Sequence, residues 1–256
     1  MKTELKIEIV PFRLDNYAYL LRDTLTEQTA VFDCGDSVPV KKVLRQNNWS
    51  VTHIFATHAH SDHTAGISDL MSYYPNARLY IAAGEKRLRG ATHRLSDGDQ
   101  VNFGNRSIKA IRVTAHTKYC MAYLISSCLF TGDALFSGGC GRIFEGSAED
   151  LMMAMDIFCA LPEDTDVFVG HEYTEANLKF ALTIERDNPD LKQYASQVKN
   201  LRNAGKFTVP TTIGLEKKIN PFLRVDLPSV RQSIDPKQEF GRARRIAVLR
   251  QLKDNF

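Results

Sequence analysis

The six residues from His58 to His63 constrain the fold of this chain more than any other feature. They read His-Ala-His-Ser-Asp-His and place four metal-capable side chains within six positions. The preceding run, residues 51–56, is β-branched and apolar, which is typical of a buried strand. Residues two apart in an extended chain point to the same side, so His58 and His60 should lie together. Asp62 and His63 should then lie on a turn that leads into a helix.

This stretch has the position and the chemistry of a metal-binding loop. Open α/β sheets bind their ligands at the carboxyl ends of strands. Imidazole and carboxylate together suit zinc, iron or manganese. One metal cannot easily take four ligands so close in sequence and stay open to substrate, so we expect two adjacent metals. The alternative, a polar loop with chance histidines, is disfavoured because three of the seven histidines of the chain lie here.

Three further ligand-type residues each follow a strand-like run. They are His116 after residues 108–113, Asp133 after residues 128–132, and His171 after residues 166–170. A single histidine after a strand is more often structural, but the joint pattern predicts that all three converge on one sheet edge. His53 lies inside its predicted strand and His93 in a predicted loop, and for both the ordinary structural interpretation is favoured.

Longer motifs give the chain a resemblance to a known family. Residues 139–146 read GCGRIFEG, residues 170–174 read GHEYT, and the chain ends LRQLKDNF. With the T-H-x-H-x-D-H motif at residues 57–63, these patterns resemble glyoxalase II, the hydroxyacylglutathione hydrolase family of the metallo-β-lactamase superfamily. The first motif marks only the superfamily, whereas the later motifs are far more specific.

The resemblance implies an α/β fold with a smaller helical domain. Residues 1–173 should form a four-layer αββα metal-binding catalytic domain, and residues 174–256 an α-helical substrate-binding domain. The sequence itself changes at the same point. Up to about residue 171 short strands alternate with helical patterns, as in layered α/β packing, and after residue 173 helical patterns dominate.

The resemblance also divides the ligands between two divalent ions, expected to be zinc, with iron and manganese as alternatives. It assigns His58, His60 and His116 to the first metal, Asp62, His63 and His171 to the second, and Asp133 to a bridge between them, with Asp62 and Asp133 counted as catalytic. A water bridging the metals would lose a proton near neutral pH. That hydroxide would attack the thioester of S-2-hydroxyacylglutathione, chiefly S-lactoylglutathione, giving glutathione and lactate, the second step of methylglyoxal detoxification.

Glutathione carries two carboxylates, so its site should contain fixed cations. By resemblance, the contacting residues are Arg142, Tyr173, Arg250 and Lys253. Arg250 and Lys253 are three residues apart and share one face of a predicted helix. From charge alone, a solvated basic face is the competing interpretation.

One segment departs from the pattern of the family. Relatives usually show G-H-T-x-G-H around the third metal histidine, whereas residues 115–120 read A-H-T-K-Y-C here. Tyr119 replaces a glycine that tolerates unusual backbone angles, so the loop should differ in shape. Cys120 could be an additional ligand, but we favour a packed thiol near the site.

Rival functions are weaker. An iron-dependent persulfide dioxygenase on the same fold would need one metal, and the C-terminal helices with Arg250 and Lys253 argue against it. A lactonase or nuclease would lack this cation set or need a broad basic groove. A metal-binding sensor of thiol metabolites without turnover is disfavoured by the complete set of seven ligands.

Composition limits the partners and the compartment. A net charge of +3 is too small to argue for nucleic acid. No apolar run approaches the ~20 residues that span a bilayer, and residues 1–10 lack the apolar core of a signal peptide. Five cysteines, an odd number without C-x-x-C, favour a reducing cytoplasm. Cys34 should be a packed thiol. We expect a cytoplasmic monomer whose partner is its small-molecule substrate.

Hydrophobic periodicity and end signals predict the elements. Strands are expected at 4–11, 17–23, 30–34, 51–56, 78–82, 107–114, 121–126, 128–131 and 166–169, and helices at 38–47, 64–74, 148–160, 176–186 and 191–203. Asp190 is a possible N-cap of the last of these helices. Residues 206–234 should be a long connection. A final helix should start at Asp235 and run to about Leu252, with Ile246, Leu249 and Phe256 facing inward.

Overall fold

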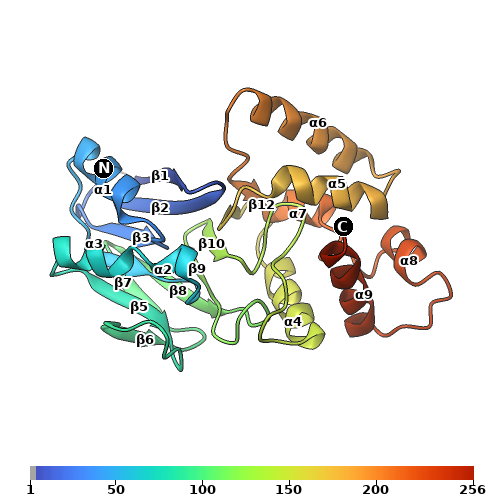
Figure 1. Cartoon of the computed structure of the whole chain (residues 1–256), viewed down its shortest axis with the longest axis horizontal. Helices are drawn as coiled ribbons and strands as arrows, with labels where there is room; N and C mark the ends of the chain where they lie inside the picture. The colour runs from blue at the N-terminus through green and yellow to red at the C-terminus, as the bar shows by residue number, and fades with distance from the viewer. Residues whose placement is uncertain (1–3) are drawn as a thin grey trace. The chain divides into compact units, whose positions relative to one another are not determined.

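The computed structural model describes residues 4–256, which fold as two compact units (Figure 1). The first unit comprises the chain up to Arg112 together with Tyr119–Gly132, and the second comprises Val113–Lys118 and Asp133–Phe256. Residues 1–3, which the predicted first domain includes, lie outside the described residues. The units are defined by packing, and the domain boundary after residue 173 stays a prediction.

The first unit contains two sheets. In the first sheet, β1, β2 and β3 run antiparallel, whereas β3 to β6 run parallel. Its strands are β1 (Leu5–Phe12), β2 (Asn16–Asp23), β3 (Thr29–Phe32), β4 (His53–Phe55), β5 (Arg78–Ala82) and β6 (His93–Leu95). In the second sheet the unit holds four antiparallel strands in the order 10-9-8-7. They are β7 (Gln100–Phe103), β8 (Arg106–Arg112), β9 (Met121–Ile125) and β10 (Cys128–Gly132).

Aromatic side chains fill the space between these two sheets. The rings of Phe32 and Phe130 stack with centroids 3.7 Å apart, and those of Phe55 and Tyr123 lie 4.9 Å apart. Such pairs add stability beyond the area that they bury. His53 lies in this core, where burial lowers its pKa to about 4. The prediction that His53 is a structural histidine is therefore confirmed, because its ring is neutral and packed among aromatic rings.

Two helices, α1 (Ser37–Asn47) and α3 (Ile67–Tyr73), pack on the first sheet, and the short helix α2 (Ser61–Thr64) precedes α3 in the chain. Leu44 of α1 and Leu70 of α3 belong to the same buried cluster as Ile54 of the sheet. Cys34 is fully buried in that cluster, and burial raises the pKa of its thiol to about 12. Cys34 is thus the packed thiol that the sequence predicts.

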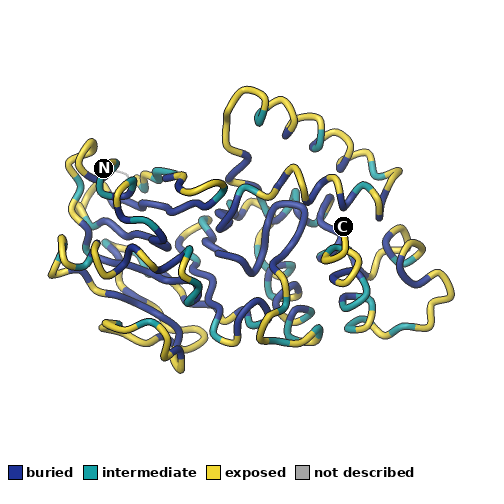
Figure 2. Tube along the Cα trace, viewed as in Figure 1, coloured by how far each residue is buried: buried dark blue, intermediate teal, exposed yellow. Residues whose placement is uncertain are grey.

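The second unit is mainly helical. It contains α4 (Ala148–Cys159), β11 (Asp166–Val169), α5 (Thr174–Ile184), α6 (Pro189–Asn203), β12 (Thr211–Thr212), α7 (Ile213–Ile219), α8 (Pro228–Ile234) and α9 (Arg242–Asp254). Leu178 of α5 packs with Leu191 and Val198 of α6. Because α6 packs on α5 along one side, buried residues recur among exposed ones along this helix (Figure 2). No helix among residues 4–256 is long and apolar enough to cross a membrane.

The α/β class, the two sheets and the C-terminal helices confirm the predicted fold class, but several elements differ from the prediction. The long connection is wrong, because residues 206–234 contain α7 and α8. The Thr212 hydroxyl caps α7 by accepting a hydrogen bond from the Leu215 amide at 3.1 Å. His93 is also not in a loop, since it opens the short strand β6.

Two helix starts also differ. Asn188 caps α6, in place of Asp190, by accepting a hydrogen bond from the Leu191 amide. The last helix begins at Arg242, because the Asp235 carboxylate accepts hydrogen bonds from amides of a preceding turn.

The predicted inward face of the last helix is partly confirmed. Ile246 and Leu249 are buried as predicted. Phe256 is 64 % exposed, so its predicted inward orientation is wrong.

Candidate metal centre

Four of the seven predicted ligands lie in the first unit, after β4 and in α2. His58 is buried, and its Nε2 lies 3.0 Å from Nδ1 of His60, as their spacing predicts. Asp62 and His63 belong to the one-turn helix α2 and not to a simple turn. The Oδ2 of Asp62 lies 3.5 Å from Nε2 of His63, and the His58 and His63 rings are 4.2 Å apart.

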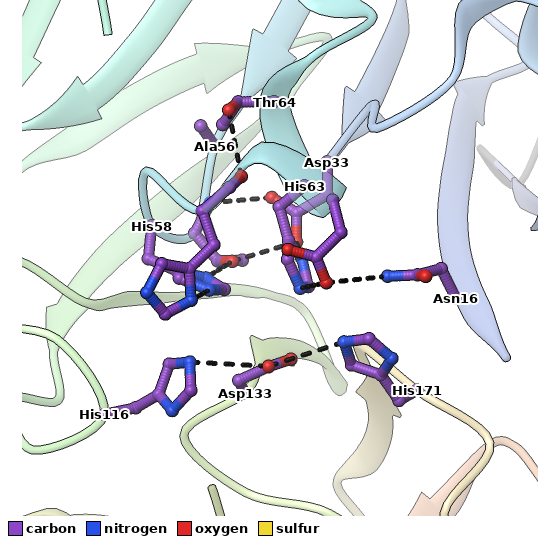
Figure 3. Close-up of polar contacts among 12 residues, drawn as sticks. Asn16, Asp33, Ala56, His58, His63, Thr64, His116, Asp133 and His171 are labelled. Carbon is purple, nitrogen blue, oxygen red and sulfur yellow. Dashed lines mark hydrogen bonds and ion pairs between the residues drawn. The ribbon is translucent and has the colours of Figure 1, made fainter. Parts of the chain in front are cut away.

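The other three predicted ligands lie together in the second unit (Figure 3). Asp133 follows β10 directly, and the same carboxylate oxygen, Oδ2, lies 3.5 Å from Nε2 of His116 and 3.4 Å from Nε2 of His171. All three side chains are buried. One oxygen of Asp133 therefore faces both imidazoles.

These spacings fit a metal ion better than direct hydrogen bonds. A charge-assisted N–H···O bond is about 2.7–2.9 Å long. Ligand atoms at about 2.0–2.1 Å from a tetrahedral zinc ion lie roughly 3.4 Å apart, which matches both contacts of Asp133. Within residues 4–256, the side chains that could hold a metal ion are the seven predicted ligands. Imidazole and carboxylate donors of this kind bind divalent metals.

A buried carboxylate that the sequence analysis missed orients His63. Asp33 accepts hydrogen bonds from the amide and the hydroxyl of Thr57 at 2.8 and 2.9 Å, and from Nδ1 of His63 at 2.8 Å. Because a carboxylate can only accept, His63 carries its proton on Nδ1 and directs the lone pair of Nε2 away. Metal-binding histidines are commonly held in this way. Asp33 has φ 56°, a left-handed conformation that aspartate tolerates better than most residues.

His116 is held by a backbone carbonyl in the same manner. Its Nδ1 donates to the carbonyl oxygen of Arg142 at 2.9 Å, which leaves Nε2 for Asp133 or a metal. The loop comes this close because residue 141 is glycine. A Cβ there would lie 2.1 Å from the Asp133 carbonyl oxygen and 2.9 Å from Nδ1 of His116. In the first unit, Asn16 similarly donates to Oδ2 of Asp62 at 3.1 Å.

The predicted cations lie around one carboxylate at the end of α9. Asp254 lies 3.5 Å from Nε of Arg142 and 3.0 Å from Nη2 of Arg250. Arg250 is only 6 % exposed and also donates to the Cys140 carbonyl at 2.9 Å. Arg250 is therefore not part of a solvated basic face.

The other two predicted substrate contacts involve aromatic rings. The Lys253 ammonium lies 5.4 Å from the ring centre of Phe180 on α5, and burial lowers its pKa. Tyr173 is partly exposed, and its ring stacks on His171 with centroids 4.7 Å apart. A residue predicted to contact the substrate, Tyr173, is therefore in direct contact with the predicted metal ligand His171.

In the segment that differs from the family pattern, residues 115–120, the last two side chains are packed. The Tyr119 ring lies against Gly84, where an added Cβ would be 2.7 Å from the ring. Cys120 is 2% exposed, as expected of a packed thiol, and its exclusion from the metal ligands stays a prediction.

Replacing Asp33 should weaken metal binding without removing a ligand. In Asp33→Asn the oxygen should stay on the Thr57 amide, and the new NH₂ group should face Nδ1 of His63. The proton of His63 must then move to Nε2, where it blocks coordination. We expect metal affinity to fall by about 10- to 100-fold. Chelator competition followed by elemental analysis measures this, with the fully exposed Asp187→Ala as the control. Wild-type affinity in Asp33→Asn would contradict this role.

Comparisons with known proteins cover the whole of this architecture. Residues 12–171 match the metallo-beta-lactamase superfamily, and residues 172–256 match the hydroxyacylglutathione hydrolase C-terminus. The hydroxyacylglutathione hydrolase of Photobacterium profundum is 39% identical over 253 residues, which cover 98% of this chain and 100% of the relative. That of Synechococcus sp. (strain JA-3-3Ab) is 43% identical over 258 residues, with coverage of 98% and 100%.

Solved structures share the fold. ETHE1 from Myxococcus xanthus superposes with a TM-score of 0.66 at 23% identity and covers 100% of both chains. TTHA1623 in a di-iron-bound form gives a TM-score of 0.60 at 20% identity and covers 84% of this chain and 98% of that chain. At these identities the likeness concerns the fold alone.

Proposed function

The chain belongs to the hydroxyacylglutathione hydrolase family of the metallo-β-lactamase superfamily, and we propose that it hydrolyses S-2-hydroxyacylglutathione thioesters. S-lactoylglutathione is the expected main substrate, giving glutathione and lactate in the second step of methylglyoxal detoxification. The observation that carries the proposal is the spacing of 3.4 and 3.5 Å between one Asp133 oxygen and two imidazoles, in a chain with this family membership.

The proposed cofactor is a pair of divalent ions, with zinc expected and iron or manganese as alternatives. His58, His60 and His116 would hold one ion, Asp62, His63 and His171 the other, and Asp133 would be shared. When bound, the ions supply Lewis acidity that activates water and stabilises charge on the thioester carbonyl. The Asp33 carboxylate and the Arg142 carbonyl keep protons on Nδ1 of His63 and His116, so that both Nε2 atoms stay available.

The proposed substrate contacts are Arg142, Tyr173, Arg250 and Lys253. Arg142 and Arg250 both lie beside the Asp254 carboxylate, which a carboxylate of glutathione would have to join or displace. These residues would bind and orient the tripeptide. The leaving group is a thiolate, which is stable enough to leave without protonation by a dedicated general acid.

The rival functions have less support. The likeness to ETHE1 is one of fold at 23% identity. The family match over residues 172–256, which contain Arg250 and Lys253, favours the glutathione thioester over a persulfide. The complete set of seven ligand-type residues and the family match over residues 172–256 disfavour a sensor without turnover.

We also propose a domain boundary after residue 173, a cytoplasmic location and a monomeric state. The change of family match between residues 171 and 172 supports the boundary. No disulfide joins cysteines within residues 4–256, which supports a reducing compartment.

Metal-loaded protein should release thiol from S-lactoylglutathione, with elemental analysis approaching two metals per chain. Both quantities should fall together during treatment with a chelator and recover when metal is restored. Oxygen uptake with glutathione persulfide serves as the comparison for the dioxygenase. Folded, metal-loaded protein without thioester hydrolysis would refute the function. Full activity at a firm limit of one metal would refute the pair of ions while leaving the hydrolase intact.

A further inference from the structure

A fully buried carboxylate of α7, Glu216, holds the loop that connects Asp133 with Arg142. It is 0% exposed and accepts four hydrogen bonds. The donors are the Ser137 hydroxyl at 2.9 Å, the Gly138 amide at 2.8 Å, the Thr211 hydroxyl at 2.7 Å and the Asn220 amide group at 3.0 Å. Each of these donors is neutral, so the carboxylate is stabilised by oriented dipoles.

A buried carboxylate at this position costs free energy of folding, so its presence calls for a functional explanation. Burial raises the pKa of Glu216, and its hydrogen bonds oppose that shift. Buried charges are costly even when they are well hydrogen-bonded. Two of its four contacts are with consecutive residues of one loop, Ser137 and Gly138. The charge is therefore directed at the loop and not only at its own helix.

Two asparagines complete the attachment of this loop. Asn220 donates to the carbonyl oxygens of Phe136 and Gly139 at 3.2 and 2.9 Å, and Asn177 donates to that of Ser137 at 3.1 Å. Phe136 and Gly139 also pair with each other through an isolated β-bridge. Side chains of Asn177, Glu216 and Asn220 therefore hold the backbone of residues 136–139 in addition to that bridge.

The same loop continues directly into both parts of the site. The Cys140 carbonyl accepts from Arg250 at 2.9 Å, and the Arg142 carbonyl accepts from Nδ1 of His116 at 2.9 Å. A shift of the loop would move both carbonyls. It would then release the Arg250 guanidinium and allow the His116 ring to turn.

We propose that Glu216 is a positioning residue, whose carboxylate fixes residues 137–142 and thereby orients His116 and Arg250. For Arg250 the inference rests on the proposed function, whereas for His116 it rests on metal binding alone. Glu216 touches neither His116 nor Arg250 among its described contacts, so it acts through the backbone of the loop.

The two oxygens of Glu216 suggest how variants should rank. Oε1 accepts from two hydroxyls, which can reverse and accept instead, whereas Oε2 accepts from two N–H groups, which cannot. Glu216→Gln can turn its NH₂ group toward the hydroxyls and keep the loop contact at Gly138. Glu216→Ala loses both oxygens. The glutamine variant should therefore lie between wild type and alanine.

Ser137 and Thr211 provide a matched pair. Both hydroxyls donate to Oε1, at 2.9 and 2.7 Å, but only Ser137 belongs to the loop. Ser137→Ala should disturb the loop, and Thr211→Val should cost stability without moving it. A lost hydrogen bond is worth about 0.5–1.5 kcal/mol, or roughly two- to tenfold in an equilibrium.

The experiment measures KM and kcat for S-lactoylglutathione, and metal retention against a chelator, in all four variants well below their unfolding temperatures. We expect Glu216→Ala to raise KM and weaken metal retention by about tenfold each, and Ser137→Ala by about two- to tenfold. Glu216→Gln should be intermediate and Thr211→Val unchanged.

Unchanged KM and metal retention in Ser137→Ala would overturn the inference, even if Glu216→Ala does not fold. An equal effect of Thr211→Val would also overturn it, because the role would then be general stability. Metal retention does not depend on turnover. If the protein fails to hydrolyse the thioester, the retention series therefore still tests the positioning of His116.

Discussion

Asp133→Ala should abolish thioester hydrolysis and weaken metal retention together. One oxygen of Asp133 faces the Nε2 atoms of both His116 and His171, so one substitution removes the ligand that the two proposed ions would share. Loss of a group that only orients a ligand lowers metal affinity or activity by about 10- to 100-fold. Loss of the shared ligand should therefore lower kcat/KM by more than roughly 100-fold. Initial rates with S-lactoylglutathione and elemental analysis of the same samples measure both effects.

Two further variants separate this effect from damage to the fold. Asp133→Asn keeps the shape but removes the charge, and should resemble Asp133→Ala in metal content while retaining the circular dichroism of wild type. Asp187→Ala removes an aspartate that is fully exposed, and should change neither quantity. If Asp133→Ala keeps two metals and near-normal turnover, Asp133 does not bridge.

Arg250→Ala should raise KM for glutathione thioesters while kcat stays within a few-fold. A contact that is kept equally in ground and transition states affects KM more than kcat. Charge-assisted hydrogen bonds are worth about 1.5–3 kcal/mol, or roughly ten- to a hundredfold in affinity. A small uncharged thioester without the tripeptide should be hydrolysed as by wild type.

The burial of Arg250 adds an expectation about stability. Its guanidinium is 6 % exposed and bonds the Cys140 carbonyl and Asp254, so alanine should also lower the unfolding temperature. The Lys253 side chain does not make these polar contacts, so Lys253→Ala should raise KM with a smaller loss of stability. Arg244→Ala, an exposed arginine on the same helix, serves as the control. Unchanged KM in both Arg250→Ala and Lys253→Ala would defeat the proposal for glutathione recognition.

Ligand residues could be predicted because periodicity and chemistry agree at them. Spacing of two brings His58 and His60 together whatever the details of the loop, and the position of Asp133 after an apolar strand places it at a strand end. The residues that orient these ligands gave no such signal. Asp33 and Glu216 are single acidic residues in ordinary surroundings, and only the folded chain shows that both are buried and surrounded by donors.

Element boundaries failed where helices are too short to show a period. The helices α7 and α8 have seven residues each, about two turns. A proline-containing stretch with two such helices has too few apolar positions to show an amphipathic face. Asp235 shows the converse problem, because a cap-like carboxylate can satisfy the amides of a turn as well as those of a helix.

The glycine at position 141 has a further consequence for how variation in this sequence is interpreted. It carries no functional group, yet any side chain there would meet the Asp133 backbone and the His116 ring together. A screen that scores only loss of activity would therefore rank Gly141 beside the ligands. Position 141 contributes to the site through the volume that it leaves empty.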